Sequence, residues 1–383
     1  MLGPRPVPDR VRVLFFISSL EQGGAERQVA ELVRGLDLAR YEPHVAVCNE
    51  TDQLGYALPF ASRTALDAPS GPTPRTLPRL VGLIRRLRPD LLHSYLGHQN
   101  IYGRLAVRLA GVGRAIGSVR CTQLPAQYIR HERLTHRLTH GLIVNSVAIR
   151  DELVRRAGLH AARIDVVENG VDAARFRPLS AEERESERRR FGMSGTTVLV
   201  PGRICAQKNQ ISVVRALARL RAEGSLPTDL EVVFAGRQED STRYGGLLQA
   251  ALGVYRLRPR VRFLGVVRDV ERLMGAADAM LLPSHYEGLP NVVLEAMGCG
   301  CPAIVSGPAN ADALVREGRE GVAIGDPTPA AIAAGLGRFL RTSAAEREAM
   351  GRAGRQHVIE RFSVGRMVSR TAEVYERVLR SPR

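Results

Sequence analysis

Residues 279–298 read AMLLPSHYEGLPNVVLEAMG, and this segment indicates the fold more clearly than any other. Four apolar residues end at Pro283, a loop containing Gly288 follows, and an apolar segment resumes after Pro290. Proline has no N–H to lose at the first position of a helix, so Pro290 is expected to occupy that position. The segment thus predicts a buried strand, a loop and a helix, the repeating unit of parallel α/β sheets.

Short apolar runs alternate with helical-period segments over the rest of the 383 residues, so the whole chain is expected to be α/β. The strands expected in the first half are 11–17, 44–48, 91–93, 115–119, 141–144 and 164–167. In the second half they are 197–200, 231–234, 261–264, 279–282, 303–306 and 321–324. Because charged residues 180–190 interrupt this alternation, a domain boundary is placed after Pro178. Doubly wound domains bind ligands at the carboxyl ends of their strands, so chemistry is expected in the loops that follow strands.

The composition indicates a folded protein of the reducing cytosol. Hydrophobic residues make up 44% of the chain, no apolar run approaches the roughly 20 residues needed to span a bilayer, and residues 1–10 lack a signal-peptide core. The five cysteines favour a reducing compartment over a disulfide framework. Cys299 and Cys301 flank a glycine, but no second Cys or His pair lies nearby in the sequence, so they are interpreted as turn residues rather than metal ligands.

The net charge of +16 is spread over both halves of the chain. A nucleic-acid-binding protein more often concentrates charge in one patch with interleaved aromatic residues, and aromatics here are only 5%. A general basic surface suits polyanionic or membrane-surface partners. Lys208 is the only lysine among the 55 basic residues. A single lysine in an arginine-rich chain indicates a position that needs a compact point charge, although chance could also have left one lysine there.

Two loops after strands suit a phosphorylated ligand. Gly23 and Gly24 lie between the first strand and its helix, where paired glycines admit a close backbone approach, although such pairs are also common in structural turns. In residues 201–209, PGRICAQKN, Arg203 can grip two phosphate oxygens and Lys208 adds a second positive charge. A solvated surface pair is the alternative interpretation of these two cations.

The loop in 279–298 contributes two carboxylates. Glu287 precedes the expected helix, where a carboxylate is favoured by the helix dipole and could serve only as a cap. Glu295 interrupts an otherwise apolar run from 292 to 297. A buried carboxylate without hydrogen-bond donors is costly, so Glu295 is expected to meet donors such as the paired hydroxyls of a ribose.

These segments resemble family 4 of the retaining glycosyltransferases, which have the two-domain GT-B fold. The most specific element is Glu287, seven residues, then Glu295, within EGLPNVVLEAM after Pro-Ser. Supporting elements are GGAER at 23–27, NGVD at 169–172, and the Gly-Arg pair at 202–203 with its downstream lysine. The resemblance covers nearly the whole chain. It implies two Rossmann-like domains facing each other across a cleft: an acceptor-binding domain at 1–178 and a nucleotide-sugar-binding domain at 179–360, with a C-terminal helix, 361–383, returning to the first.

The resemblance also implies a role for each matched residue. Arg203 and Lys208 would hold the donor diphosphate and offset charge on the departing nucleotide. Glu287 would bind hydroxyls of the donor sugar, and Glu295 the ribose hydroxyls. Catalysis is assigned to Arg203, Lys208 and Glu287. The donor-binding set would be completed by Gly24, Gly202, Gly288, Leu289 and Pro290, which lie beside the diphosphate and sugar.

The acceptor side departs from the family pattern. Many members carry a histidine after a middle strand of the first domain, and Arg120 stands at that place here. His93 and His98 are the nearest histidines, and each could equally be a structural histidine with satisfied ring nitrogens. Arg120, His93 and His98 are therefore the candidate acceptor-side residues.

The expected reaction is transfer of a sugar from a nucleotide diphosphate to an acceptor hydroxyl, with retention of the anomeric configuration. As the resemblance implies, the leaving phosphate can take the acceptor's proton, so neither a dedicated base nor a metal or other cofactor is predicted. The expected acceptor is a glycan or lipid-linked molecule of cell-surface polysaccharide or glycolipid biosynthesis. Residues 76–88 predict a basic amphipathic helix, which would either contact anionic lipid at the inner face of the cell membrane or simply cover a sheet.

Two other functions remain open from the sequence. A sugar-nucleotide epimerase on a similar scaffold would bind the same donor without an acceptor. A non-catalytic nucleic-acid-binding protein would account for the charge but leaves the arrangement of Glu287 and Glu295 without a purpose. The glycosyltransferase interpretation accounts for both observations, and with it no nucleic acid is expected as a partner.

Overall fold

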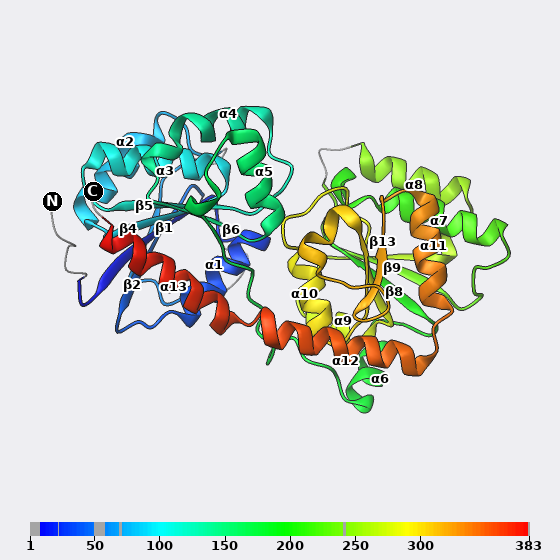
Figure 1. The fold of residues 1–383 in the computed structure, drawn as a ribbon. Helices are drawn as coiled ribbons and strands as arrows, with labels where there is room; N and C mark the ends of the chain where they lie inside the picture. Colours follow the sequence, from blue (N-terminus) through cyan, green and yellow to red (C-terminus); the bar gives the residue numbers. More distant parts are fainter. Residues whose placement is uncertain (1–7, 22, 50–57, 69–70, 240–242, 382–383) are drawn as a thin grey trace. The chain divides into compact units, whose positions relative to one another are not determined.

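The computed structural model describes residues 8–21, 23–49, 58–68, 71–239 and 243–381. The chain divides into two compact units (Figure 1). Unit 1 comprises Met1–Gly170 together with Val364–Arg383, and unit 2 comprises Val171–Ser363. The sequence had suggested divisions after 178 and 360. Each unit has its own parallel sheet covered by helices, as the alternating pattern predicts.

Unit 1 is built on a parallel sheet whose described strands run in the order β3-β2-β1-β4-β5-β6-β7. Their bounds are β1 Val11–Ile17, β2 Tyr41–Val47, β3 Ser62–Ala65, β4 Leu91–Tyr95, β5 Arg114–Val119, β6 Gly141–Val144 and β7 Ile164–Val166. The six strands expected from apolar runs are all present, whereas β3 was not expected. Its sequence, SRTA, is half-buried at the sheet edge and gives no apolar signal.

Helices cover both faces of this sheet. On one face, α1 (Gly24–Gly35) and the C-terminal α13 (Val364–Arg380) share a core with β1 and β2. On the other, α2 (Thr76–Leu87) and α3 (Gly97–Ala110) pack on β1 and β4. A third cluster joins α4 (Ala126–Thr135) and α5 (Val147–Ala157) to β5 and β6. The C-terminal helix therefore packs on the first sheet, as expected: its residues Met367, Val374, Tyr375 and Val378 are buried.

Unit 2 is built on a parallel sheet with described strands in the order β10-β9-β8-β11-β12-β13. Their bounds are β8 Thr197–Pro201, β9 Glu231–Ala235, β10 Val261–Gly265, β11 Ala279–Leu282, β12 Ala303–Ser306 and β13 Gly321–Ile324. One face carries α9 (Val270–Ala276), α10 (Asn291–Gly298) and α12 (Ala344–Arg361). The other carries α7 (Gln210–Ala222), α8 (Tyr244–Val254) and α11 (Pro329–Leu340).

The charged segment at 180–190 forms α6 (Ala181–Arg190), which belongs to unit 2. Ser180 and Glu183 make a capping box at its start, so the N-terminal N–H groups are satisfied locally. Ion pairs from Arg184 and Arg188 to Asp278 then hold this polar helix against the edge of the core. Its lack of an apolar face explains why the sequence pattern is interrupted there.

Candidate functional site

Two loops leave the sheet of unit 2 where the strand order reverses. Strands β8 and β11 are hydrogen-bonded neighbours, and both are parallel, so the loops 202–209 and 283–290 emerge at the same edge. Such a switch point is where doubly wound sheets bind ligands. Gln207 ties the loops together: its Nε2 donates to the Tyr286 carbonyl at 3.0 Å, and its own carbonyl accepts from the His285 N–H at 2.9 Å. The two predicted donor-site loops are thus joined.

Lys208 and Glu287 form an ion pair across these loops. The Lys208 Nζ lies 2.6 Å from the Glu287 Oε1, and the side chains are only 14% and 12% exposed. Screening by solvent is weak for charges with so little exposure. The chain's single lysine therefore supplies its charge beside the carboxylate that begins the two-glutamate motif.

Arg203 lies in the same loop as Lys208 but is more accessible. Its side chain is 53% exposed, Nη1 contacts the Glu239 Oε1, and Nη2 donates to the Gln207 Oε1 at 3.4 Å. Gly202 before it has φ +126°, in the region that favours glycine, and a Cβ there would come 3.1 Å from the Lys208 Cε. The absence of a side chain at Gly202 therefore leaves room for the aliphatic part of Lys208 to pack against the loop backbone.

The loop ends at Asn209, a residue that the sequence did not single out. Asn209 has φ 58° and precedes α7, and its side chain donates to the carbonyls of Pro283 and Pro327 at 3.2 and 2.8 Å. These two bonds fix the loop that carries Lys208 to two other strand-end loops. Neither Asn209 nor Gln207 gives a sequence signal, because single amides in loops are common; only their closeness to Lys208 could have indicated them.

Helix α10 begins next to the ion pair. Pro290 is its N-cap, with φ −74° and ψ 113°, so the helix starts at Asn291 rather than at the proline, one position later than expected. Gly288, Leu289 and Pro290 are buried between Glu287 and the helix. Glu295 lies one turn inside α10 and is 2% exposed among apolar neighbours, as its interruption of that run predicts. The positive end of α10 therefore adjoins the Lys208 loop.

The candidate residues of unit 1 are spread along the carboxyl edge of its sheet and over its interior. Gly24 is the first residue of α1, just after β1. His98 is exposed in the first turn of α3. His93 is fully buried on β4; its Nδ1 lies 2.7 Å from the Tyr375 hydroxyl and its Nε2 lies 2.8 Å from the Ser118 Oγ. Burial lowers the pKa of His93 far below the usual value, so it has the environment of a structural histidine.

Arg120 follows β5 and is half-buried. Its Nη1 donates to the Asn169 Oδ1 at 2.7 Å, and its guanidinium lies 5.1 Å from the centre of the Tyr95 ring. Desolvation lowers the pKa of Arg120, but the guanidinium stays charged. The structure thus places a cation at a strand end of unit 1, beside the asparagine of the 169–172 segment.

The described residues offer neither a cluster of metal ligands nor a membrane-spanning helix. No group of three or more His, Cys, Asp or Glu side chains is placed there to hold a metal ion. Among the helices of the same residues, none has the length and apolar character needed to cross a membrane. Cys299 and Cys301 are both buried, and burial raises the pKa of the Cys299 thiol to about 12.

The fold of the chain is similar to that of a solved structure. The Anabaena protein Alr3699/HepE, solved with UDP-glucose, superposes with a TM-score of 0.83 and 20% identity over 96% of this chain and 100% of that one. At this identity the similarity concerns the fold alone. Two units, each with its own parallel sheet covered by helices, together with this similarity, give the chain the GT-B fold.

The sequence matches narrow this class to a family. Residues 182–357 match Glycosyl transferases group 1, and residues 22–175 match Glycosyltransferase Family 4. A D-inositol 3-phosphate glycosyltransferase of Salinispora tropica is 32% identical over 75% of this chain and 63% of that protein. A glycogen synthase of Mycobacterium tuberculosis H37Rv is 31% identical over 77% of this chain and 70% of that enzyme. The chain belongs to this glycosyltransferase family, and the matches support neither an epimerase nor a nucleic-acid-binding protein.

Proposed function

We propose that the chain transfers a sugar from a nucleotide diphosphate to an acceptor hydroxyl with retention of configuration. The observation that carries the proposal is the Lys208–Glu287 ion pair, which joins the loops after β8 and β11 at the switch point of unit 2. It brings together a cation for the diphosphate and a carboxylate for sugar hydroxyls. The UDP-glucose bound in the solved Anabaena complex agrees with this donor class.

Each group has a role in the proposed reaction. Arg203, Lys208 and the start of α10 direct positive charge to the diphosphate, where negative charge grows as the sugar departs; fixed charges aimed at developing charge are the main source of such catalysis. Glu287 accepts from donor-sugar hydroxyls and Glu295 from the ribose. The leaving phosphate takes the acceptor's proton. The reaction as proposed uses no metal. Gly24 is assigned to the donor side through the family resemblance, and Arg120 and His98 remain acceptor-side candidates where the chain departs from the family pattern.

A thermal-shift screen against a panel of nucleotide sugars tests the donor class. A ligand present at 100 times its dissociation constant stabilises the folded protein by about 2.7 kcal/mol. Stabilisation by one nucleotide sugar identifies the base and the sugar. Stabilisation by none of the panel, with the protein folded, contradicts the proposal.

Replacement of Glu295 by glutamine is expected to weaken nucleotide binding about tenfold. Glu295 is 2% exposed in α10, and a carboxylate accepts from both ribose hydroxyls more strongly than an amide does. The dissociation constant of the nucleoside diphosphate, measured by calorimetry, checks this. Glu348→Gln, an exposed position on α12, is the control. An unaltered dissociation constant in Glu295→Gln would remove the residue from the donor site.

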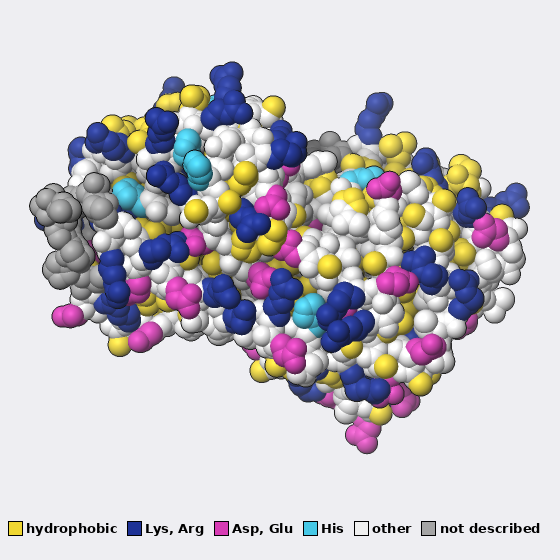
Figure 2. Space-filling model, in the orientation of Figure 1, with side chains coloured by type: hydrophobic (Ala, Val, Ile, Leu, Met, Phe, Trp, Pro, Cys, Tyr) yellow, Lys and Arg dark blue, Asp and Glu magenta, His cyan; other side chains and the backbone are white. Residues whose placement is uncertain are grey.

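The acceptor is proposed to be anionic, lipid-linked or polymeric, with unit 1 at the inner surface of the cell membrane. The apolar face of α2 is committed to the core of unit 1, but its arginines are exposed (Figure 2), as are Leu109 at 55% and Leu134 at 69%. Arg85 donates to the Leu109 carbonyl at 3.0 Å, so basic and apolar groups adjoin there. Such a surface favours anionic lipid through charge with shallow apolar contacts.

Co-sedimentation with phosphatidylglycerol vesicles at low salt tests this location. Reversing Arg86 and Arg108 to glutamate is expected to weaken binding at least roughly thirtyfold, because each lost basic residue removes about 1 kcal/mol and each added carboxylate is repelled by the anionic surface. Reversal of Arg189 and Arg352, exposed in unit 2, is the charge-matched control and should change binding much less. Absence of wild-type binding, or equal loss in both variants, excludes this surface.

A further inference from the structure

Arg203 has both of its terminal nitrogens engaged before any ligand is present. Nη1 pairs with the Glu239 carboxylate, and Nη2 donates to the Gln207 Oε1 at 3.4 Å. A guanidinium grips a phosphate best through two parallel N–H groups. A guanidinium carries five N–H donors, so a diphosphate that approaches Arg203 either displaces Glu239 from Nη1 or shares the guanidinium with its carboxylate.

Backbone contacts between two neighbouring loops hold Glu239 in place. Beyond the ends of β8 and β9, the Ile204 N–H donates to the Arg237 carbonyl at 2.9 Å, and Ile204 forms a parallel bridge with Gln238. Gly236 allows the close approach, since a Cβ there would come 2.0 Å from the Gly202 carbonyl oxygen. The backbone that carries Glu239 is thus held near Arg203 by the fold of the sheet edge, and the ion pair then joins the two side chains.

We propose that Glu239 sets the affinity of the site for the diphosphate group by competing for Arg203, and that it disfavours the released nucleoside diphosphate more than the donor. This inference rests on the proposed function. Glu239 is 26% exposed and remains near the guanidinium when a diphosphate arrives, so it repels the ligand as well as occupying Nη1. It thereby acts as an affinity-setting residue at the edge of the donor site.

The discrimination follows from the charges of donor and product. In the donor both phosphates are esterified, whereas the product has a free terminal phosphate whose second ionisation has a pKa near 6. The product therefore carries nearly one more negative charge at neutral pH. A fixed carboxylate opposes that additional charge and so favours release of product after transfer. A residue that merely positioned Arg203 would strengthen the binding of both donor and product, and it would not favour the donor over the product.

Four variants separate these possibilities: Glu239→Gln, Arg203→Ala, the double variant, and Glu223→Gln as control. Glutamine keeps the shape and an acceptor oxygen while removing the charge. Glu223 forms a comparable exposed pair with Arg219, but at the far end of α7, away from the Lys208 loop. Calorimetry with UDP, UDP-glucose and inorganic pyrophosphate, at low and high salt, gives the dissociation constants; pyrophosphate serves whichever base the enzyme prefers.

Glu239→Gln is expected to bind UDP and pyrophosphate about fivefold more tightly, the size of one solvent-exposed charge interaction, and UDP-glucose less than threefold more tightly. The gain should fall at high salt and disappear in the Arg203→Ala background. The inference is contradicted if Glu239→Gln binds the ligands more weakly, or if it leaves the ratio of the UDP and UDP-glucose dissociation constants unchanged. The proposed donor site still stands in that case, provided that Arg203→Ala weakens the binding of pyrophosphate. If Arg203→Ala leaves all three ligands unaffected, or none of them binds, the proposed donor site itself is contradicted.

Discussion

Replacing Lys208 by alanine is expected to lower kcat about 30- to 1,000-fold while the protein stays folded. Lys208 is the cation that the loop after β8 holds in a largely buried position, 14% exposed, next to α10. Removing one preorganised charge from a site where negative charge develops costs about 2–4 kcal/mol of barrier. The loss should appear in kcat measured at saturating donor, because the diphosphate gains charge only as the bond to the sugar breaks.

Glu287 increases this expected effect. In the intact protein it is paired with Lys208 at 2.6 Å, and in the alanine variant its carboxylate faces the diphosphate without that neutralising charge. Lys208→Arg should recover part of the rate, since it restores the charge but not the compact ammonium. The matched control is Arg215→Ala, an exposed cation on the neighbouring α7, for which kcat should change less than twofold. A folded Lys208→Ala enzyme with normal kcat would show that the negative charge of the departing diphosphate develops away from Lys208.

The sequence predicted most of the fold because the two sheets are buried on both faces. Strand β11 is a continuous apolar run and β1 is interrupted only by Arg12, and their expected bounds, 279–282 and 11–17, are those observed. The edge strand β3 was missed because its SRTA segment is only half-buried. The ends of helices were less well predicted, since capping depends on backbone conformation: Pro290 precedes α10 instead of starting it.

The candidate site was predictable where chemistry demands unusual residues. A single lysine and a glutamate inside an apolar helix stand out in the sequence, and the structure places Lys208 against Glu287 and buries Glu295. Gln207, Asn209 and Glu239 did not stand out, because polar residues in loops are ordinary and their importance comes from what folding brings beside them. Which residues of different loops meet at the edge of a sheet depends on the order of the strands, and a local sequence pattern does not reveal that order.

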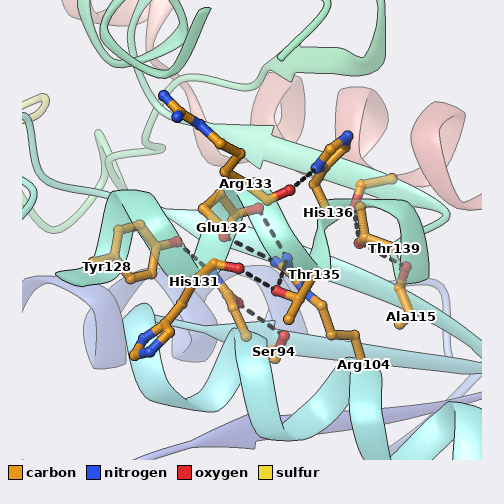
Figure 3. Close-up of polar contacts among 12 residues, drawn as sticks. Ser94, Arg104, Ala115, Tyr128, His131, Glu132, Arg133, Thr135, His136 and Thr139 are labelled. Atoms are coloured by element: carbon orange, nitrogen blue, oxygen red, sulfur yellow. Dashed lines mark hydrogen bonds and ion pairs between the residues drawn. The ribbon is translucent and has the colours of Figure 1, made fainter. Parts of the chain in front are cut away.

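Replacing Glu132 by alanine is expected to destabilise unit 1 by about 3–5 kcal/mol. Figure 3 shows the pair involved: Arg104 of α3 reaches Glu132 of α4, with both terminal nitrogens on the carboxylate at 2.9 and 3.1 Å. The side chains are 1% and 0% exposed. Removing one partner leaves the other charge buried and uncompensated, which accounts for the size of the effect. The Thr135 hydroxyl, 3.0 Å from the same guanidinium, does not neutralise it.

Urea unfolding followed by far-UV circular dichroism measures the change, because the chain contains no tryptophan. Since two units can unfold separately, amide hydrogen exchange in peptides of α3 and α4 assigns the loss to unit 1. Arg155→Ala breaks an exposed pair with Glu152 in the same unit and should cost less than about 0.5 kcal/mol. Equal stability of Glu132→Ala and the wild-type protein would contradict the burial of this pair.

The double variant Arg104→Met with Glu132→Leu distinguishes charge from packing. Apolar residues of similar volume avoid the desolvation of both charges, so the pair of substitutions should return stability to within about 1–2 kcal/mol of the wild-type value, or above it. If the double variant were as unstable as Glu132→Ala, the loss would come from packing between α3 and α4 and not from a stranded guanidinium. Because α4 follows the loop that begins at Arg120, acceptor KM measured in the double variant also reports whether this ion pair positions that loop.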